Sequence, residues 1–416
     1  MTVATKSGER QALCEKVAAF IRCTDEDSQA PDSGGDKSSA SEREFEALAL
    51  EVFAYQFETI PAYRKLCRGV GRTPDTVTSW RGIPAVPALA FKQYSLFSGA
   101  PDEVARTFRS SGTSEPGRSS QAHFSRIGIE VMDTAVAAAA RSRLFPDGRH
   151  TRILVLTPPP EQVPHMIMVH GMGHLIRTYG LDGSRFVGGP KGVDFAALWT
   201  ELADCQKAGV PVSLLGASFG FVHFFDWMEQ AGRRLELPPG SRIMDAGGYK
   251  GRSREIGRDA FVTWASQMCG VRRERVVNLL GMTELATQIY DQIALDTAVA
   301  PIRPITRMKL PPRWMRTQVI DPRRQGPNGP EPVAAGELGL LRHLDLANVE
   351  RPMVIQSEDV GRAVTANADG TLSQGFEIVG RAKGAEPRGC SLSAEDLASS
   401  PPRQGEREAR TASAPA

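Results

Sequence analysis

Residues 109–120 form the segment of this chain that is best suited to bind a charged group. Four hydroxyls surround one glycine there and an arginine follows, so that the residues are Ser110, Ser111, Gly112, Thr113, Ser114 and Arg118. Backbone N–H groups, hydroxyls and one cation in such a loop suit a polyphosphate. No Gly-Lys-Ser/Thr closes the segment as in the common P-loop, so taken alone it is equally typical of a polar surface turn.

The elements around this loop, and a second polar pair, favour a ligand site. A short apolar segment at residues 104–108 precedes the loop, and the alanine-rich residues 127–141 predict a helix behind it. Thr283 and Glu284 follow another apolar run at residues 275–280. We therefore expect this pair just beyond the end of a strand, where open α/β sheets bind their ligands.

Two later polar segments add further candidates. Asp359 follows the short apolar run at residues 353–355, and Arg381 begins a Gly- and Lys-containing segment that leads to Cys390. Three basic residues within ten positions of Cys390 favour a lowered pKa of its thiol. A free cysteine is also often a small buried residue, so both interpretations of Cys390 stay open at this point.

The order of these segments resembles that of the adenylate-forming superfamily of acyl- and aryl-CoA ligases, luciferases and peptide-synthetase adenylation domains. Within it the chain most resembles the LuxE-type acyl-protein synthetases, over residues 45–398. Besides residues 109–120, which we call the hydroxyl loop, the resemblance is carried by residues 83–87 with 91–92, 247–251, 282–285 with 290–291, and 388–392. The sequence departs from the superfamily pattern at Glu115, Arg118 and Leu280, which replace a glycine, a lysine and an aromatic residue.

The resemblance implies an AMP-forming ligase that uses ATP and Mg²⁺ to activate a carboxylic acid, here a fatty acid, as an acyl-adenylate and transfers it to a thiol. It implies that the loop from Ser110 to Ser114, with Arg118, holds the phosphates. The other implied roles are an α-phosphate contact from Thr283, a Mg²⁺ ligand in Glu284, an adenine wall from Gly247, Gly248 and Tyr249, a ribose contact from Asp359 in a turn, a hinge contact from Arg381 and an acyl-carrying thiol in Cys390. The expected protein partner is an acyl reductase or an acyltransferase.

If the chain is an AMP-forming ligase of this kind, another residue must replace the superfamily's catalytic lysine. That lysine lies in a C-terminal domain for which we expect no room, because only residues 399–416 follow the matched region. A cation within the body of the fold is then expected to take its place. Lys250, in the Gly-rich segment after Gly248, is the preferred candidate, and Lys92 is the second.

The apolar runs predict an α/β fold of adenylate-forming type with a largely parallel sheet. Runs at residues 153–157, 210–215, 243–245 and 276–280 are bounded by Gly or Pro and separated by helical stretches, as buried parallel strands are. We expect a helix at residues 11–22 and a mobile insertion at 24–41 within residues 1–44, the α/β core over 45–335, a small β-rich subdomain with the hinge-like motif over 336–398, and a disordered tail over 399–416.

Several other functions are compatible with parts of the sequence. Gly216, Ser218 and Gly220 fit the G-x-S-x-G motif of serine hydrolases, but a Gly-rich turn is favoured because only His343 lies well downstream. His123, His165, His170 and His174 lack the carboxylate or cysteine that completes a metal-ligand spacing. An acyl-CoA ligase of the phenylacetate-CoA ligase type and a non-catalytic scaffold that binds a partner protein also stay open.

The composition excludes some classes of protein. The 50 basic and 48 acidic residues nearly cancel, which disfavours a nucleic-acid binder driven by phosphate attraction. No apolar run approaches the ~18 residues of a membrane span, and the first residues lack a signal-peptide core. The six cysteines form no C-x-x-C pair, so we expect free thiols and a cytoplasmic location.

Overall fold

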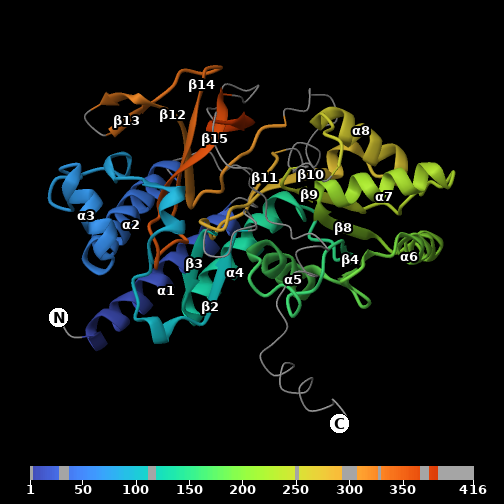
Figure 1. Ribbon diagram of the computed structural model, residues 1–416, viewed down its shortest axis with the longest axis horizontal. Helices are drawn as coiled ribbons and strands as arrows, with labels where there is room; N and C mark the ends of the chain where they lie inside the picture. Colours follow the sequence, from blue (N-terminus) through green and yellow to red (C-terminus); the bar gives the residue numbers. More distant parts are fainter. Residues whose placement is uncertain are drawn as a thin grey trace, which may run out of the picture.

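The computed structural model describes residues 3–27, 37–110, 119–248, 253–292, 307–326, 329–365 and 374–382. Two six-stranded sheets dominate these ranges (Figure 1). The first, the parallel sheet, has the order β11-β10-β9-β8-β4-β5, with β11 antiparallel at its edge. Its strands are β4 (Arg152–Val155), β5 (Arg185–Phe186), β8 (Val212–Ala217), β9 (Arg242–Ala246), β10 (Val276–Leu280) and β11 (Ile289–Tyr290). The predicted α/β fold with a largely parallel sheet is confirmed.

Successive residues of the central strands point to opposite faces of the parallel sheet and so belong to two different cores. Leu214 of β8 packs in the core that contains α6 (Phe195–Ala208), α7 (Ser218–Gln230) and α8 (Arg258–Cys269). Leu215 belongs to the core that contains α4 (Arg126–Arg143) and α5 (Ile167–Tyr179). Because both faces of β8 and β9 are buried, apolar residues occupy adjacent positions in these strands, as at Leu214 and Leu215 or Ile243 and Met244. The four expected strands are confirmed.

The second sheet is formed mainly by the later part of the chain and stands at the top of Figure 1 in orange. Its strands are β1 (Val86–Pro87), β12 (Met315–Gly326), β13 (Gly329–Pro332), β14 (Leu338–Asp345), β15 (Val354–Thr365) and β16 (Gln374–Arg381). β12 pairs with β13 on one side and with β14 on the other. The domain boundary expected at residue 336 therefore cuts through this sheet, because the hydrogen bonds between β12 and β14 cross it.

Three N-terminal helices pack on the same core as α4 and α5. They are α1 (Val3–Asp27), α2 (Lys37–Thr59) and α3 (Pro61–Gly69), and they contribute buried side chains such as Val17, Phe45 and Tyr63. α1 is longer than the helix expected at residues 11–22. A mobile insertion was expected at residues 24–41, but residues 24–27 belong to α1 and residues 37–41 belong to α2, so the prediction is wrong for these two ends. Residues 28–36 lie outside the described ranges.

A two-stranded hairpin positions the two ends of the hydroxyl loop. β2 (Arg106–Arg109) pairs antiparallel with β3 (Gln121–Phe124), and α4 begins just after β3. Ser125 caps α4, since its hydroxyl accepts a hydrogen bond from the N–H of Gly128. The expected order of strand, loop and helix is thus corrected to strand, loop, strand and helix. A four-residue strand is too short to show a clear periodicity in the sequence.

Shorter elements complete the described chain. They are the strands β6 (Gly188–Gly189) and β7 (Gly192–Val193), and the 3₁₀ helices η1 (Trp80–Gly82), η2 (Ala88–Lys92), η3 (Pro101–Glu103) and η4 (Arg273–Arg275). Across the ranges that the structure describes, no helix combines the length and the apolar character needed to cross a membrane.

Candidate functional site

A cavity of about 350 Å³ lies where the strands of the parallel sheet end. The last residues of three neighbouring strands line it: Ala217 of β8, Ala246 of β9 and Leu280 of β10. Parallel strands place their carboxyl ends at one edge of the sheet, and ligands of open α/β sheets bind at that edge. Residues of α5, β15 and β16 form other parts of the wall. The cavity is therefore the candidate site.

Apart from the second candidate cation, Lys92, every predicted site residue that the structure describes lines this cavity, although these residues are far apart in the sequence. They are Ser110, Gly247, Gly248, Thr283, Glu284, Asp359 and Arg381. The other predicted residues lie outside the described ranges: Ser111, Gly112, Thr113, Ser114, Arg118, Tyr249, Lys250 and Cys390. Lys92 ends η2 and is not one of the residues that line the cavity.

Thr283 and Glu284 lie in the loop after β10, and their side chains are 2% and 1% exposed. Asp345, the last residue of β14, holds this loop. Its carboxylate accepts hydrogen bonds from the N–H groups of Ala286 and Thr287 at 3.0 and 2.8 Å. It also accepts one from the hydroxyl of Thr287 at 2.7 Å. A buried carboxylate of the second sheet thus fixes a loop of the parallel sheet.

Asn348 adds a second anchor for the same loop. Its side-chain amide donates a hydrogen bond of 2.8 Å to the carbonyl of Glu284. Burial raises the pKa of Asp345, and the hydrogen bonds from Thr287 act in the opposite direction. Sequence reasoning missed Asp345 and Asn348. The available signal was a carboxylate and an amide within the otherwise apolar residues 344–349.

Asp359 and Arg381 face each other on neighbouring strands. Their Cα atoms are register partners between β15 and β16, and Arg381 Nε lies 3.4 Å from Asp359 Oδ1. Arg381 also donates a hydrogen bond of 2.7 Å to Glu358. The expectation of a turn at Asp359 is wrong, because β15 continues to Thr365 with a register shift after Val360. Pairing with both β14 and β16 sustains this strand.

Ser218 of the G-x-S-x-G motif supports the turn at Gly247. It begins α7, is 2% exposed, and its hydroxyl lies 2.8 Å from Asp245 Oδ2 and 3.0 Å from the carbonyl oxygen of Gly247. The nucleophilic serine of a G-x-S-x-G hydrolase is paired with a histidine as its general base, whereas this hydroxyl faces a carboxylate and a carbonyl. Gly247 has a φ of +73°, a region that favours glycine. The motif here is a structural turn.

A buried ionic network lies beneath that turn and consists of Ser218, Asp245, Arg258, Asn278, Asp291 and Lys309. Asn278, which lines the cavity, donates to Asp245 at 2.9 Å and accepts from Lys309 at 2.7 Å. Burial lowers the pKa of Lys309, although Asp291 lies 2.9 Å from its Nζ. Sequence reasoning missed Lys309, because the basic residues around it are typical of a solvated face.

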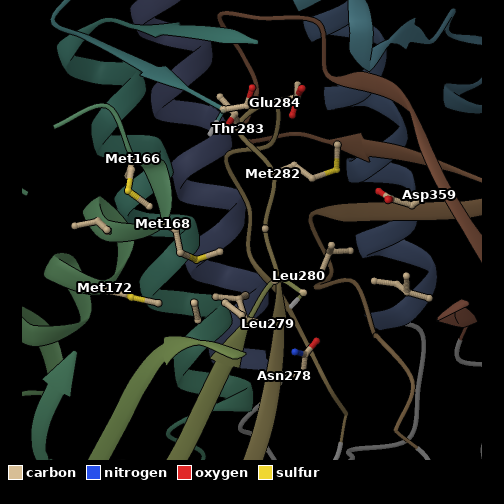
Figure 2. Close-up of a pocket in the computed structure, with 18 of the residues that line it drawn as sticks. Met166, Met168, Met172, Asn278, Leu279, Leu280, Met282, Thr283, Glu284 and Asp359 are labelled. Carbon is tan, nitrogen blue, oxygen red and sulfur yellow. The ribbon is translucent and has the colours of Figure 1, made fainter. Parts of the chain in front are cut away.

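The side of the cavity formed by α5 is apolar and rich in methionine. Met168 and Met172 of α5 and Met166 before it lie on one side in Figure 2, opposite Asp359. We call these three residues the methionine wall. Met282, which precedes Thr283, also lines the cavity, on the side of Asp359 in Figure 2. Methionine is unbranched and has three rotatable bonds, so it adapts to the shape of a ligand. This wall suits an apolar chain.

Three of the four histidines considered as metal ligands, His123, His170 and His174, form hydrogen bonds to other side chains. His170 lies between Arg106 and Asp133. Its Nδ1 is 2.8 Å from the guanidinium of Arg106, and its Nε2 is 2.8 Å from the carboxylate of Asp133. His123 contacts the hydroxyl of Thr107, also at 2.8 Å. Within the described ranges, no three His, Cys, Asp or Glu side chains come together in a way that could hold a metal ion.

Known proteins resemble this chain over most of its length. Residues 36–398 match the family model described as acyl-protein synthetase, LuxE. The long-chain-fatty-acid–luciferin-component ligase of Vibrio harveyi is 23% identical over 350 residues, which cover 83% of this chain and 86% of that protein. The ligase of the same name from Aliivibrio fischeri is 22% identical over 351 residues, with the same coverage of both chains.

Solved structures of adenylate-forming ligases share the fold. A 2-hydroxyisobutyryl-CoA ligase in complex with 2-HIB-AMP has a TM-score of 0.57 and 14% identity, over 82% of this chain and 67% of its own. Its thioesterification state has a TM-score of 0.55, over 85% and 72% of the two chains. At this identity the likeness concerns the fold alone. The family model, however, spans residues 36–398, and the chain therefore belongs to the LuxE family of acyl-protein synthetases, AMP-forming ligases that make an acyl-adenylate and transfer its acyl group.

Proposed function

We propose that this protein activates a long-chain carboxylic acid with ATP and then carries the acyl group on its own Cys390. One observation carries the proposal: a single cavity joins polar side chains that suit a nucleotide to a methionine wall that suits an acyl chain. Both relatives named above are ligases of a long-chain fatty acid, which supports the substrate class.

In the first reaction, a carboxylate oxygen of the acid attacks the α-phosphorus of ATP, and pyrophosphate leaves with the bonding electrons. Donors at fixed positions stabilise the charge on the phosphate oxygens, and no protein nucleophile is needed. We assign the α-phosphate contact to Thr283, because it lines the cavity just past the end of β10.

The hydroxyl loop is assigned to the remaining phosphates. Ser110, at the start of this loop, lines the cavity. Its N–H donates a hydrogen bond of 3.0 Å to the carbonyl of Ser120, and its hydroxyl accepts one of 2.9 Å from the N–H of Ser120. These bonds close the base of the loop on the side of the cavity. We propose that Ser111, Gly112, Thr113, Ser114 and Arg118 hold the β- and γ-phosphates, although they lie outside the described ranges.

The turn after β9 and the strand β15 are assigned to the nucleoside. A Cβ added at Gly247 or Gly248 would meet nothing within 4 Å, so this backbone is open to a flat ring. We propose that both glycines, with Tyr249, contact adenine. Asp359 is assigned to the ribose hydroxyls, and Arg381, 3.4 Å away, orients its carboxylate.

Mg²⁺, which the chemistry of ATP implies, fits the residues of the cavity. Glu284 offers a carboxylate beside the hydroxyl of Thr283, and this hard cation prefers such oxygen ligands. Magnesium sites at nucleotides use one or two carboxylates together with substrate phosphates, so one carboxylate is sufficient. When bound, the ion neutralises charge on the phosphates. We propose that Glu284 holds it.

In the second reaction, the thiolate of Cys390 attacks the acyl carbonyl, forms a thioester and releases AMP. Cys390 lies outside the described ranges, eight positions beyond Ala382. Eight residues of extended chain span at most about 28 Å, and Arg381, which precedes Ala382, lines the cavity. The thiol is therefore within reach of an adenylate bound there. An acyl reductase or acyltransferase would then receive the acyl group.

A cation besides Mg²⁺ is expected near the transferring phosphorus. We propose Lys250, which lies two positions beyond the cavity-lining Gly248. Arg118 and Lys92 are the other candidates. Lys309 is a poor one, because its ammonium group is buried against Asn278 and Asp291.

The proposal is tested by ATP–pyrophosphate exchange over a panel of carboxylic acids. The expected results are acid-dependent exchange and, on a denaturing gel, a hydroxylamine-labile acyl label on the wild type. Cys390→Ser should keep the exchange and lose the label. A label that persists in Cys390→Ser places the acceptor on another residue. Consumption of coenzyme A without a label makes the protein an acyl-CoA ligase, and no exchange with any acid contradicts the adenylation itself.

A further inference from the structure

A second, smaller cavity of about 20 Å³ lies behind the methionine wall. It shares three lining residues with the main cavity: Met168, Gly281 and Met282. A space of this size holds about one water molecule. These three residues, which we call the partition, therefore lie between the main cavity and a void lined by core side chains.

Met168 closes this partition through its flexible end. A Cβ added at Gly281 would lie 2.8 Å from Met168 Cε, so the terminal methyl rests directly against the backbone of Gly281. Met168 is 6% exposed and Met282 is 7% exposed. Rotation about the side-chain bonds of two methionines costs little compared with a backbone movement, and it would join the two spaces.

The far side of the small cavity is suited to an apolar chain. It is lined by Met132 and Val136 of α4 and by Leu285 and Ala286. The polar residues at its end already have partners within the protein. Thr287 donates to Asp345 at 2.7 Å, and Gln288 accepts from Tyr290 at 2.7 Å.

We propose that Met168 and Met282 form a movable partition that sets the length of the acyl chain, with the end of a long chain entering the space beside α4. This inference rests on the proposed function. Sites for drug-sized ligands span roughly 300–1,000 Å³, so the main cavity of about 350 Å³ is small for a nucleotide and a long chain together. The chain end therefore needs room beyond the partition.

The test measures kcat/KM in the exchange assay for straight-chain acids of increasing length. Met168→Ala removes the partition and should shift the preferred acid to a longer chain. The gain over wild type should be about fourfold for each additional methylene that becomes buried. Met282→Ala, on the opposite half of the partition, should shift the preference in the same direction, and it serves if Met168→Ala is unstable.

Two further variants separate the partition from a general loss of packing. Met228→Ala makes the same change at a buried position in the other core and should leave the preferred chain length unchanged. Adding Val136→Phe to Met168→Ala refills the space from α4 and should return the preference to shorter acids.

The outcomes distinguish this inference from the function on which it rests. If none of the acids supports pyrophosphate exchange by the wild type, the proposed function is contradicted. If the wild type exchanges normally, and Met168→Ala and Met282→Ala prefer an acid of the same chain length as the wild type, only the partition is contradicted. A shift of equal size in Met228→Ala would show that the effect is one of stability, and this result also overturns the partition.

Discussion

The polar side and the methionine wall of the cavity hold their side chains in different ways. On the polar side, Asp345 anchors the loop of Thr283 and Glu284, and Ser218 supports the turn at Gly247. On the methionine wall, unbranched side chains of α5 face the same space. Reaction at phosphorus requires fixed donors, whereas an apolar chain needs only a surface that adapts to it. In the proposed function, the cavity separates these two requirements onto different sides.

The largest effect is expected at Glu284. Glu284→Gln keeps the size of the side chain but removes the charge proposed to hold Mg²⁺. Acid-dependent pyrophosphate exchange should fall by at least ~10²-fold, the usual scale for one lost transition-state contact. The melting temperature is the control and should stay close to the wild-type value. Full exchange in this variant would remove Glu284 from the proposed site.

A somewhat smaller effect is expected when the anchor beneath the loop is weakened. Asp345→Asn loses a charged acceptor, and hydrogen bonds to charged groups are worth about 1.5–3 kcal/mol, which corresponds to a fall in kcat of roughly 10- to 100-fold if the loop moves. Asp321→Asn, on β12 of the same sheet, is the matched control. Equal kcat values for the two variants would show that the loop keeps its position without Asp345.

Ser218→Ala should have a modest effect on the binding of ATP. The part of its hydrogen bonding that supports the turn goes to the neutral carbonyl of Gly247. Such a bond is worth about 0.5–1.5 kcal/mol, so KM for ATP should rise roughly two- to tenfold at nearly constant kcat. Fluorophosphonate probes, which label nucleophilic serines, should leave Ser218 unmodified. Labelling of Ser218 would restore the hydrolase interpretation.

The smallest effect is expected on the methionine wall. Met172→Leu conserves the volume of an apolar side chain, and such exchanges usually cost less than about 1.5 kcal/mol. The value of kcat/KM for the preferred acid should change less than about threefold. A loss as large as that of Asp345→Asn would mean that the wall is as rigid as the polar side, and the contrast between the two sides would not hold.

The sequence was most informative where local patterns are strong. The run at residues 276–280 is apolar because both faces of the sheet are covered, and it correctly placed Thr283 and Glu284 at the end of β10. The family resemblance was confirmed over residues 36–398. The chemical roles of the lining residues are predictions that the variants above test.

Three residues that the sequence misplaced or missed share a physical cause, which is contact between segments distant in the sequence. Asp359 was expected in a turn, but partners on β14 and β16 extend its strand. Lys309 is typical of an exposed residue until Asn278 and Asp291 are placed beside it. Asp345 contacts a loop 58 positions earlier in the chain, and no local pattern reveals such a contact.

The contact between Asp345 and the Thr287 segment has a consequence for heat resistance. One carboxylate at the end of β14 connects the second sheet to the loop that carries Thr283 and Glu284. Partial loosening of the second sheet would therefore disturb that loop while the parallel sheet is still intact. On gradual warming, we expect activity to be lost at a lower temperature than the far-UV circular dichroism signal.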